Sequence, residues 1–291
     1  MLPISPRQLQ VFVQVVAGGS LRAAAEALHM TQPAASMALA EMEKQLGAPL
    51  FDRERGRLRL NPHGRELLPL AQELLERHAE LGRVAASGGT RLTGDLRIGT
   101  SNTVGNYRVG ELLGGFVREY PQVALRLRVG NTGEIAQALL DHDLDLACVE
   151  GPVIHPQLEV RAWREDALVV CVPPQHRLAA LPVVRPKDFA GERWILREPG
   201  SATRSLSEQA LAKLPPPRGV LELSQTEAIK QAVVAGLGIA CLPEVAIRDA
   251  VATGQLVALA TPFLALQRTL SLLVHRKRYR GAALAAFLRM A

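Results

Sequence analysis

The chain has 291 residues and a formal net charge of +6 at pH 7, with an isoelectric point near 9.6. This length allows two or three folded units, and the positive charge suits a nucleic-acid binder. Residues 1–90 hold ten Lys or Arg against nine Asp or Glu, so local placement rather than total charge must indicate DNA binding. No apolar run reaches about 18 residues and no basic leader precedes one, which excludes a membrane partner and predicts a cytoplasmic protein.

The first 46 residues predict three short helices. Each begins after a hydroxyl residue that can cap the free backbone N–H groups of a first turn, namely Ser5, Ser20 and Thr31. Apolar residues follow at the helical period; they are Leu9, Phe12, Val13 and Val16, then Leu21, Ala24, Ala25 and Leu28, then Ala35, Leu39, Met42 and Leu46. Helices this short are marginal alone, so they are expected to share one core as a helix-turn-helix. Gln32 and Ser36 then point outward.

Residues 51–60 predict a hairpin after these helices. Arginines recur with a period of two around Gly56, at positions Arg53, Arg55, Arg57 and Arg59. Arginine side chains and free helix N–H groups neutralise phosphates, and small polar side chains at a helix start reach base edges. The segment therefore predicts a winged helix-turn-helix that binds duplex DNA, with an ordinary three-helix bundle and a solvated hairpin as the alternative.

Asn61 and Pro62 predict the start of a long helix that ends near Ser87, before a hinge over residues 87–90. Its seam positions alternate spacings of four and three, as in a coiled coil; they are Leu67, Ala71, Leu74, His78, Leu81 and Ala85. Such a helix spans roughly 40 Å and predicts a dimer whose two DNA-binding heads reach successive grooves. Pro69 falls inside it and is expected to kink it.

From Gly94 onward, short apolar strands alternate with helices. Strands are expected at residues 96–101, 123–129, 144–151, 167–173, 193–198, 220–224, 238–243 and 270–275. Helices are expected at 134–141, near 203–213, 226–236 and 244–252, at the end of the chain, and after residue 101, where Val109, Leu112, Leu113, Phe116 and Val117 face inward. This order predicts an α/β fold of two lobes joined by crossing strands. The expected domains are 1–60 (DNA-binding), 61–88 (linker helix) and 89–291 (two lobes, about 93–165 plus 269–291, and 166–268).

Strand ends in an open α/β sheet bring helix N-termini to one crevice, where a ligand is expected. Small polar residues occupy four such junctions, which are Ser101, Asn102 and Thr103; Asn131, Thr132 and Gly133; Gly200, Ser201, Ala202 and Thr203; and Ser224, Gln225 and Thr226. Their hydroxyls and free N–H groups suit an anion, although any one junction alone is better explained as a helix cap. Arg197 and Arg204 either add a fixed charge there or are structural. Glu150 and Glu198 are expected to pair with arginine or face water.

No pattern in the chain predicts catalysis, a metal site or a cofactor. Cys148, Cys171 and Cys241 lie far apart in apolar runs without a CxxC pair, so buried inert thiols are expected, with a redox switch as the alternative. The histidines are scattered, and no Ser/His/Asp arrangement or Gly-rich phosphate loop occurs. The chain is therefore not expected to be an enzyme.

The run FVQVVAGGSLRAAAEALHMTQPAASMALAEMEKQLGAPLFDR resembles the N-terminal domain of LysR-type transcriptional regulators. The resemblance implies that Arg53 lies in the wing and that the recognition helix begins with Thr31, Gln32, Pro33, Ala35 and Ser36. Many members carry basic residues just after the position of Ser36, whereas Met37, Ala38, Leu39, Ala40 and Glu41 follow here. Phosphate binding is then expected to rest on the wing, with Arg55 and Arg57, and on helix ends.

The likeness continues in SNTVGNY, GNTGEIAQALL, LREPGSATR and TEAIKQAVVAGLGIACLP, which are similar to the sulfur-linked branch of this family, some of whose members sense sulfite or other small sulfur anions. It implies a two-lobed effector domain like a periplasmic solute-binding protein, no cofactor, a homodimer and a homotetramer. The implied effector cavity lies between the lobes and includes Ser101, Asn102, Thr103, Asn131, Thr132, Ser201, Thr203 and Thr226. A small oxyanion suits such hydroxyls and amides, and Arg197 is a further candidate contact.

Two other classes of function fit part of the sequence. A solute-binding protein would share the two lobes, but it needs export and no signal segment is present. An enzyme would use the same crevice, without any recognised catalytic arrangement. A ligand-responsive regulator accounts for both halves of the chain, because an effector that changes the lobe angle can alter the spacing of the paired DNA-binding heads.

Overall fold

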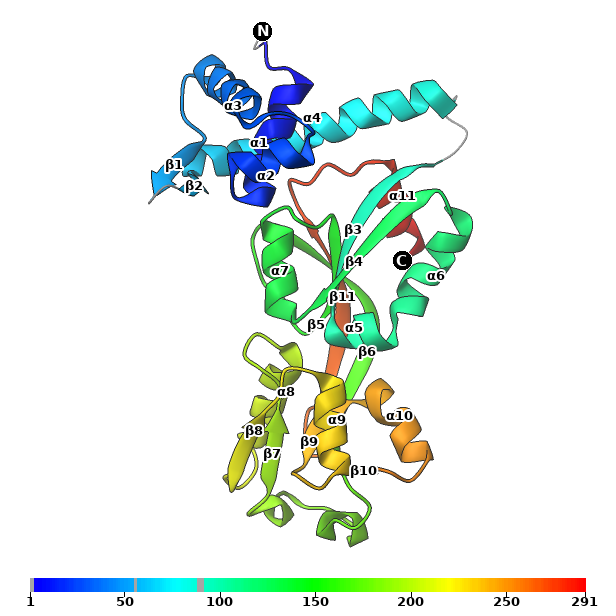
Figure 1. The fold of residues 1–291 in the computed structure, drawn as a ribbon. Coiled ribbons are helices and arrows are strands. Elements are labelled where there is room, and N and C mark those ends of the chain that lie inside the picture. Colours follow the sequence, from blue (N-terminus) through cyan, green and yellow to red (C-terminus); the bar gives the residue numbers. More distant parts are fainter. Residues whose placement is uncertain (1–2, 55–56, 88–91) are drawn as a thin grey trace. The chain divides into compact units, whose positions relative to one another are not determined.

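The computed structural model describes residues 3–54, 57–87 and 92–291, without the side chains of residues 53, 54, 57, 86 and 87. The chain divides into two compact units, residues 1–94 with 277–286 and residues 95–276 with 287–291 (Figure 1). Each unit has its own hydrophobic core.

The first unit is a winged helix-turn-helix followed by a long helix. Its elements are α1 (Pro6–Gly18), α2 (Leu21–Ala27), α3 (Gln32–Leu46), β1 (Phe51–Glu54), β2 (Arg57–Leu60) and α4 (Pro62–Ser87). The predicted caps are confirmed, because Ser5, Ser20 and Thr31 each accept a hydrogen bond from a first-turn backbone N–H. The strands β1 and β2 form the predicted antiparallel hairpin. Of the hinge predicted at residues 87–90, Ser87 is the last residue of α4, and residues 88–90 lie outside the described part of the chain.

The three short helices share one core, as their apolar faces predict. The most deeply buried positions come from all three helices and from the residue before β1; they are Val11, Phe12, Val15, Ala24, Ala35 and Leu50. The small Ala24 and Ala35 let α2 and α3 approach α1 closely. The packing is what holds these short helices, since none would be stable alone.

The long helix α4 carries two different apolar surfaces. Leu67 and Ala71, predicted in the dimer seam, instead pack into the helix-turn-helix core, and Ala71 is only 3% exposed. The other predicted seam positions face solvent, with Leu74 and Leu81 exposed by 55% and 70%. The prediction was wrong for the first two residues because the start of α4 has a nearer apolar partner, the head itself.

A C-terminal segment of the first unit, residues 277–286, packs against α4. Arg278 pairs with Glu76 and donates to Gln72, and the Tyr279 hydroxyl donates to Glu80 at 2.7 Å. The guanidinium of Arg77 lies 4.2 Å from the centre of the Tyr279 ring. Polar contacts along one stripe of α4 therefore hold this segment in place.

The second unit is an α/β domain of two lobes. The first lobe contains β3 (Gly94–Ser101), α5 (Asn102–Tyr107), α6 (Val109–Glu119), β4 (Val123–Gly130), α7 (Thr132–Leu140) and β5 (Leu146–Glu150). The second contains η1 (Arg177–Ala180), η2 (Pro186–Phe189), β7 (Arg193–Leu196), α8 (Ala202–Leu211), β8 (Gly219–Glu222), α9 (Thr226–Val234), β9 (Ala240–Pro243), α10 (Glu244–Ala252) and β10 (Val257–Leu259). The helix α11 (Ala282–Met290) ends the chain.

Two long strands, β6 (Leu158–Val172) and β11 (Gln267–His275), join the lobes. The hydrogen-bonded order is β10-β6-β11-β5-β3-β4, with β9 also paired to β6. The start of β6 pairs with β11 in the first lobe, and its end pairs with β9 and β10 in the second (Figure 1). The crossing strands thus fix the edge along which the two lobes face each other.

The structure corrects three details of the predicted α/β domain. Strand β6 begins at Leu158, nine residues before the predicted start at residue 167, because its polar first half is the edge strand of the first lobe and needs no apolar run. The short strand β10 was not predicted. Val117, expected to face inward, is 47% exposed, because the buried face of α6 centres on Leu112 and Phe116 and Val117 points to the side of it.

Candidate functional site

The N-terminus of α3 presents an exposed polar surface. Thr31, Gln32, Pro33 and Ser36 are exposed, as expected for residues that meet DNA. Ala35 is fully buried in the head, so it positions α3 rather than touching a ligand. Residue 55 and the side chains of Arg53 and Arg57 lie outside the described residues, although the backbone of Arg53 and Arg57 forms the hairpin.

At the junction between the lobes, Arg268 at the start of β11 contacts both of them. Its Nη2 donates to Thr103 Oγ1 at 3.1 Å in the first lobe, and its Nη1 donates to Thr203 Oγ1 at 2.9 Å in the second. Its Nε donates to Asp166 Oδ2 at 2.7 Å, and its Nη1 lies 3.8 Å from Glu150 Oε1. Thr103, Glu150, Asp166, Thr203 and Arg268 are called the inter-lobe cluster below.

The cluster contains buried oxygens that the described residues do not satisfy. Glu150 Oε1 accepts from Thr103 at 3.0 Å, whereas Glu150 Oε2 has no hydrogen-bond partner among the described residues. The same holds in the described structure for the hydroxyls of Thr100 and Ser101, which precede Thr103 and are fully buried. Buried polar atoms normally find partners, so Glu150 Oε2 marks a point in the cluster where a water or a polar ligand group would bind.

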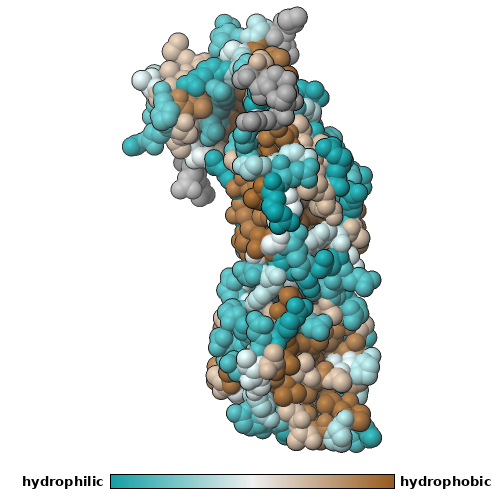
Figure 2. Space-filling view, turned by 90° about the vertical axis from the view of Figure 1, so that its right-hand side faces the viewer, coloured by the Kyte–Doolittle hydropathy of each residue, from teal (hydrophilic) through white to brown (hydrophobic). Residues whose placement is uncertain are grey.

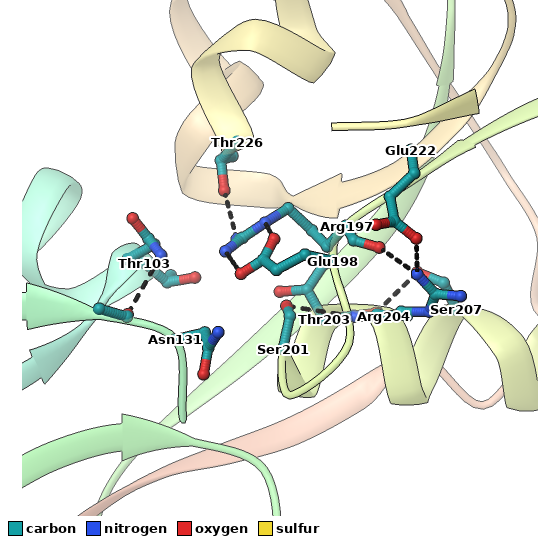
Figure 3. A network of polar contacts seen from close by, with 12 residues as sticks. Thr103, Asn131, Arg197, Glu198, Ser201, Thr203, Arg204, Ser207, Glu222 and Thr226 are labelled. Atoms are coloured by element: carbon teal, nitrogen blue, oxygen red, sulfur yellow. Dashed lines mark hydrogen bonds and ion pairs between the residues drawn. The ribbon is translucent and has the colours of Figure 1, made fainter. Parts of the chain in front are cut away.

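A second group of polar contacts surrounds Arg197, which is 2% exposed. Its guanidinium forms two bonds with Glu198, at 2.7 and 2.8 Å, and donates to Thr226 Oγ1 at 3.1 Å. Burial alone would raise the pKa of Glu198, but hydrogen bonds from Arg197 and the charge of Arg197 outweigh it and lower that pKa. Figure 3 shows Arg197, Glu198 and Ser201 of the second lobe opposite Thr103 and Asn131 of the first.

The remaining predicted residues serve partly as caps and partly as contacts between the lobes. Asn131 caps α7, and the N–H of Gly133 donates to Gly200 O at 3.1 Å across the lobes. Ser201 caps α8, and Thr132 donates to Glu150 O at 3.2 Å. Tyr107 of the first lobe also reaches the second, because its hydroxyl lies 3.5 Å from Glu227 Oε2. Burial and the charge of Glu227 raise the pKa of Tyr107 to about 12.

A cavity of about 660 Å³ opens beside the inter-lobe cluster. Its walls come from the N-termini of α7 and α8, from residues 151–154 and from the start of β11, and its lining includes Thr132, Ile154, Gly200, Leu206 and Arg268. Of the nine predicted effector residues, Thr132 lines this cavity; eight do not. Asn102 instead holds the end of β4, donating to Gly130 O at 3.1 Å.

Arg268 and Asp166 were not predicted from the sequence. Each stands at or just before the apolar run of a strand that crosses between the lobes, and their charges are opposite. Opposite charges beside the apolar runs of the two crossing strands were therefore the sequence signal that could have predicted this ion pair. Their hydroxyl partners, Thr103 and Thr203, lie at strand-to-helix junctions, which small polar residues mark in the sequence.

The three cysteines lie in the cores of the lobes. Cys148 and Cys171 are fully buried and Cys241 is 3% exposed, and burial raises the pKa of all three thiols. Because the thiolate is the reactive form, the native protein at pH 8 is expected not to react with Ellman's reagent, whereas all three thiols react after unfolding. Rapid reaction of even one native thiol would instead support the redox alternative.

Comparison with known proteins assigns both units. Residues 6–65 match the family described as bacterial regulatory helix-turn-helix protein, lysR family, and residues 89–291 match the LysR substrate binding domain. The chain is 40% identical over 286 residues to the uncharacterized HTH-type transcriptional regulator YeiE of Escherichia coli K12, covering 98% of this chain and 96% of the relative.

Solved structures share the architecture. A full-length OxyR variant from Pseudomonas aeruginosa superposes with a TM-score of 0.75 at 24% identity, covering 99% of this chain and 95% of that one. The regulatory domain of Synechocystis PCC6803 CcmR, solved in complex with 2-PG, superposes with a TM-score of 0.63 at 27% identity, covering 68% and 95%. No helix in the described residues is long and apolar enough to cross a membrane. The chain belongs to the LysR family of helix-turn-helix transcriptional regulators.

Proposed function

We propose that this regulator binds double-stranded promoter DNA through α3 and its wing, and responds to a small anion held by the inter-lobe cluster. The observation that carries the effector proposal is Arg268, whose guanidinium binds hydroxyls of Thr103 and Thr203 on opposite lobes. An anion that takes over these contacts changes what holds the lobes together. Such a differential contact is what a ligand needs to shift a conformational equilibrium.

Sulfite or a related sulfur anion is the effector we favour. Two carboxylates, Glu150 and Asp166, balance the two arginines near them, Arg268 and Arg108, so the site has little positive charge in excess and suits a singly charged anion better than a doubly charged one. Glu150 Oε2, which lacks a partner among the described residues, can accept a hydrogen bond from a ligand that carries a proton. Sulfite retains a proton in part of its population near neutral pH and sulfate does not. The cluster is therefore expected to prefer sulfite to sulfate.

A larger organic anion is a second candidate, because the adjoining cavity of about 660 Å³ lies within the range of pockets that bind organic ligands. Its lining combines the apolar Val153, Ile154 and Leu206 with Arg268 at one wall. The CcmR domain was solved with 2-PG, an organic ligand, at 27% identity to this chain. In this case the anionic end would reach Arg268 and the rest of the molecule would fill the cavity.

A thermal-shift screen of the full chain with sulfite, sulfate, thiosulfate, phosphate and small organic carboxylates separates these candidates. A ligand at a hundredfold excess over Kd stabilises the native state by about 2.7 kcal/mol, which raises the melting temperature by roughly 5–10 °C. Thr103→Ala combined with Ser201→Ala should remove the shift and leave DNA binding intact, while Thr253→Ala, directly after α10, should keep it. A normal shift in the double variant would place the ligand elsewhere.

We also propose that the chain acts as a homodimer joined through α4 and as a homotetramer. The exposed stripe of α4, with Leu70, Leu74, Leu81 and Val84, supports a helix-to-helix dimer contact. The effector domain exposes further apolar residues at Val117, Leu127, Val129 and Val251. Figure 2 shows hydrophobic surface between hydrophilic regions on one face of the protein. Additional self-association would cover such residues.

Gln32→Ala is expected to weaken binding to the specific operator about five- to a hundredfold, the range for one lost base contact. Gln32 is exposed at the start of α3, so the change should spare dimerisation and thermal stability. DNase footprinting with a fluorescence anisotropy titration measures the effect, and Gln137→Ala on α7 provides the matched control. An unchanged footprint with Gln32→Ala would assign base recognition to other side chains.

A further inference from the structure

Asp166 is shared by two arginines at unequal distances. Its Oδ2 lies 2.7 Å from both Nε and Nη2 of Arg268, whereas its Oδ1 lies 3.6 Å from Nη2 of Arg108, beyond hydrogen-bond length. The Asp166 side chain is 1% exposed, so water cannot stabilise its charge if an arginine moves away. The two contacts are therefore coupled through one buried carboxylate.

Arg108 lies at the break between α5 and α6, and its guanidinium has an N–H group that no described residue accepts. Its backbone, with φ −132°, ends one helix and begins the next. Its Nη1 reaches Glu111 at 3.2 Å, and Glu111 in turn pairs with Arg164 at 2.6 Å. Its Nε is buried without a hydrogen-bond partner among the described residues. Arg108 can therefore accept a closer approach of Asp166 without losing a contact at Nε.

We propose that Asp166 is a switch carboxylate that passes effector occupancy from Arg268 to the first turn of α6. The inference rests on the proposed anion site for its trigger. An anion that binds the guanidinium of Arg268 weakens its bond to Asp166, and the buried carboxylate then tightens on Arg108. Arg108 thereby becomes a positioning residue, with Glu111 and Arg164 as its neighbours on the outer side and Glu150 facing Arg268 on the inner side.

Hydrogen exchange without any ligand tests the switch. Arg268→Gln removes the competing guanidinium, so the first-turn amides of α6 around Leu112, whose N–H donates to Arg108 O at 3.0 Å, should exchange more slowly than in wild type. The expected slowing is about two- to tenfold, the range of one net hydrogen bond. Arg268→Lys, which keeps the charge, should restore wild-type exchange. Unchanged or faster exchange in folded Arg268→Gln would overturn the switch.

Further variants separate the switch from general destabilisation. Adding Arg108→Gln or Asp166→Asn to Arg268→Gln should abolish the slowing, whereas Arg97→Gln, which breaks the ion pair to Asp145 in the same lobe, should not. Should Arg268→Gln fail to fold, the comparison of Arg268→Lys with Arg268→Lys plus Asp166→Asn gives the test, with faster exchange expected in the second. Persistence of the slowing without Arg108 would contradict the proposal.

Sulfite at saturating concentration then tests the trigger on wild-type protein. Slower exchange at α6 that disappears in Arg108→Gln is the expected result. If sulfite does not bind while Arg268→Gln still slows exchange, the effector proposal fails and the switch stands. If sulfite binds by calorimetry and α6 exchange does not change, the switch fails and the effector proposal stands.

Discussion

Replacing Arg268 by glutamine should lower the free energy of unfolding of the effector domain by about 3 kcal/mol and abolish its response to anions. Removing one member of a buried ion pair leaves charge without its main partner, here on Glu150 and on Asp166, for which Arg108 compensates only in part. For a domain of this size the melting temperature should fall by roughly 6–12 °C. Denaturant unfolding of wild type and variant gives the energy, and the anion thermal-shift screen gives the response.

The double variant Arg268→Gln plus Asp166→Asn supplies the control for this cost. It removes the negative charge of Asp166 together with the guanidinium of Arg268. It should therefore be more stable than Arg268→Gln alone, although still without an anion response. Additive losses from the two changes would mean that the residues act independently. A stable Arg268→Gln variant that keeps its anion response would remove Arg268 from the site.

Leu74→Glu combined with Leu81→Glu should convert the protein to a monomer and reduce operator affinity by about 10²- to 10⁴-fold, the factor that bivalent attachment contributes. The two leucines are 55% and 70% exposed on α4, so the charges are tolerated in an isolated chain but not in an apolar seam between two copies. Mass photometry measures the oligomer, and anisotropy titration measures DNA binding.

Val183→Glu is the matched control, since Val183 is 67% exposed on the second lobe, away from α4 in the sequence. It should leave both the oligomer and the operator affinity unchanged. A Leu74→Glu, Leu81→Glu variant that remains dimeric would assign dimerisation to a surface other than the α4 stripe. A monomeric variant with full operator affinity would show that paired heads are not needed for binding.

Local signals in the sequence predicted the secondary structure well. A hydroxyl before an apolar helical stripe predicted the starts of α1, α2 and α3, because both the cap and the stripe act within a few residues. The same logic found the junctions that end β3 and begin α8. The first half of β6 was not predicted, since an edge strand can be polar on both faces and then lacks the alternation of apolar and polar residues that marks a strand.

The candidate site depended on contacts that no local pattern contains. Thr103 and Arg268 are 165 residues apart in the chain, yet their side chains lie at hydrogen-bond distance. Thr103 and Thr203 were among the predicted effector residues, but the sequence did not predict Arg268, the charge that meets their hydroxyls. For Arg197 a fixed charge in the crevice and a structural role were both left open, and it pairs with Glu198. Ala35 was likewise predicted to contact DNA but is buried, because the recognition-helix motif does not say which of its residues face the core.

The central claim is that an anion binds between the two lobes at Arg268. Selenite has the shape and protonation behaviour of sulfite, and its selenium scatters anomalously, so a crystal of the full chain grown with selenite locates the anion directly. The expected result is one anomalous peak between the hydroxyls of Thr103 and Thr203 and the guanidinium of Arg268. A protein that binds selenite in solution but shows its peak outside the inter-lobe cluster would contradict the claim.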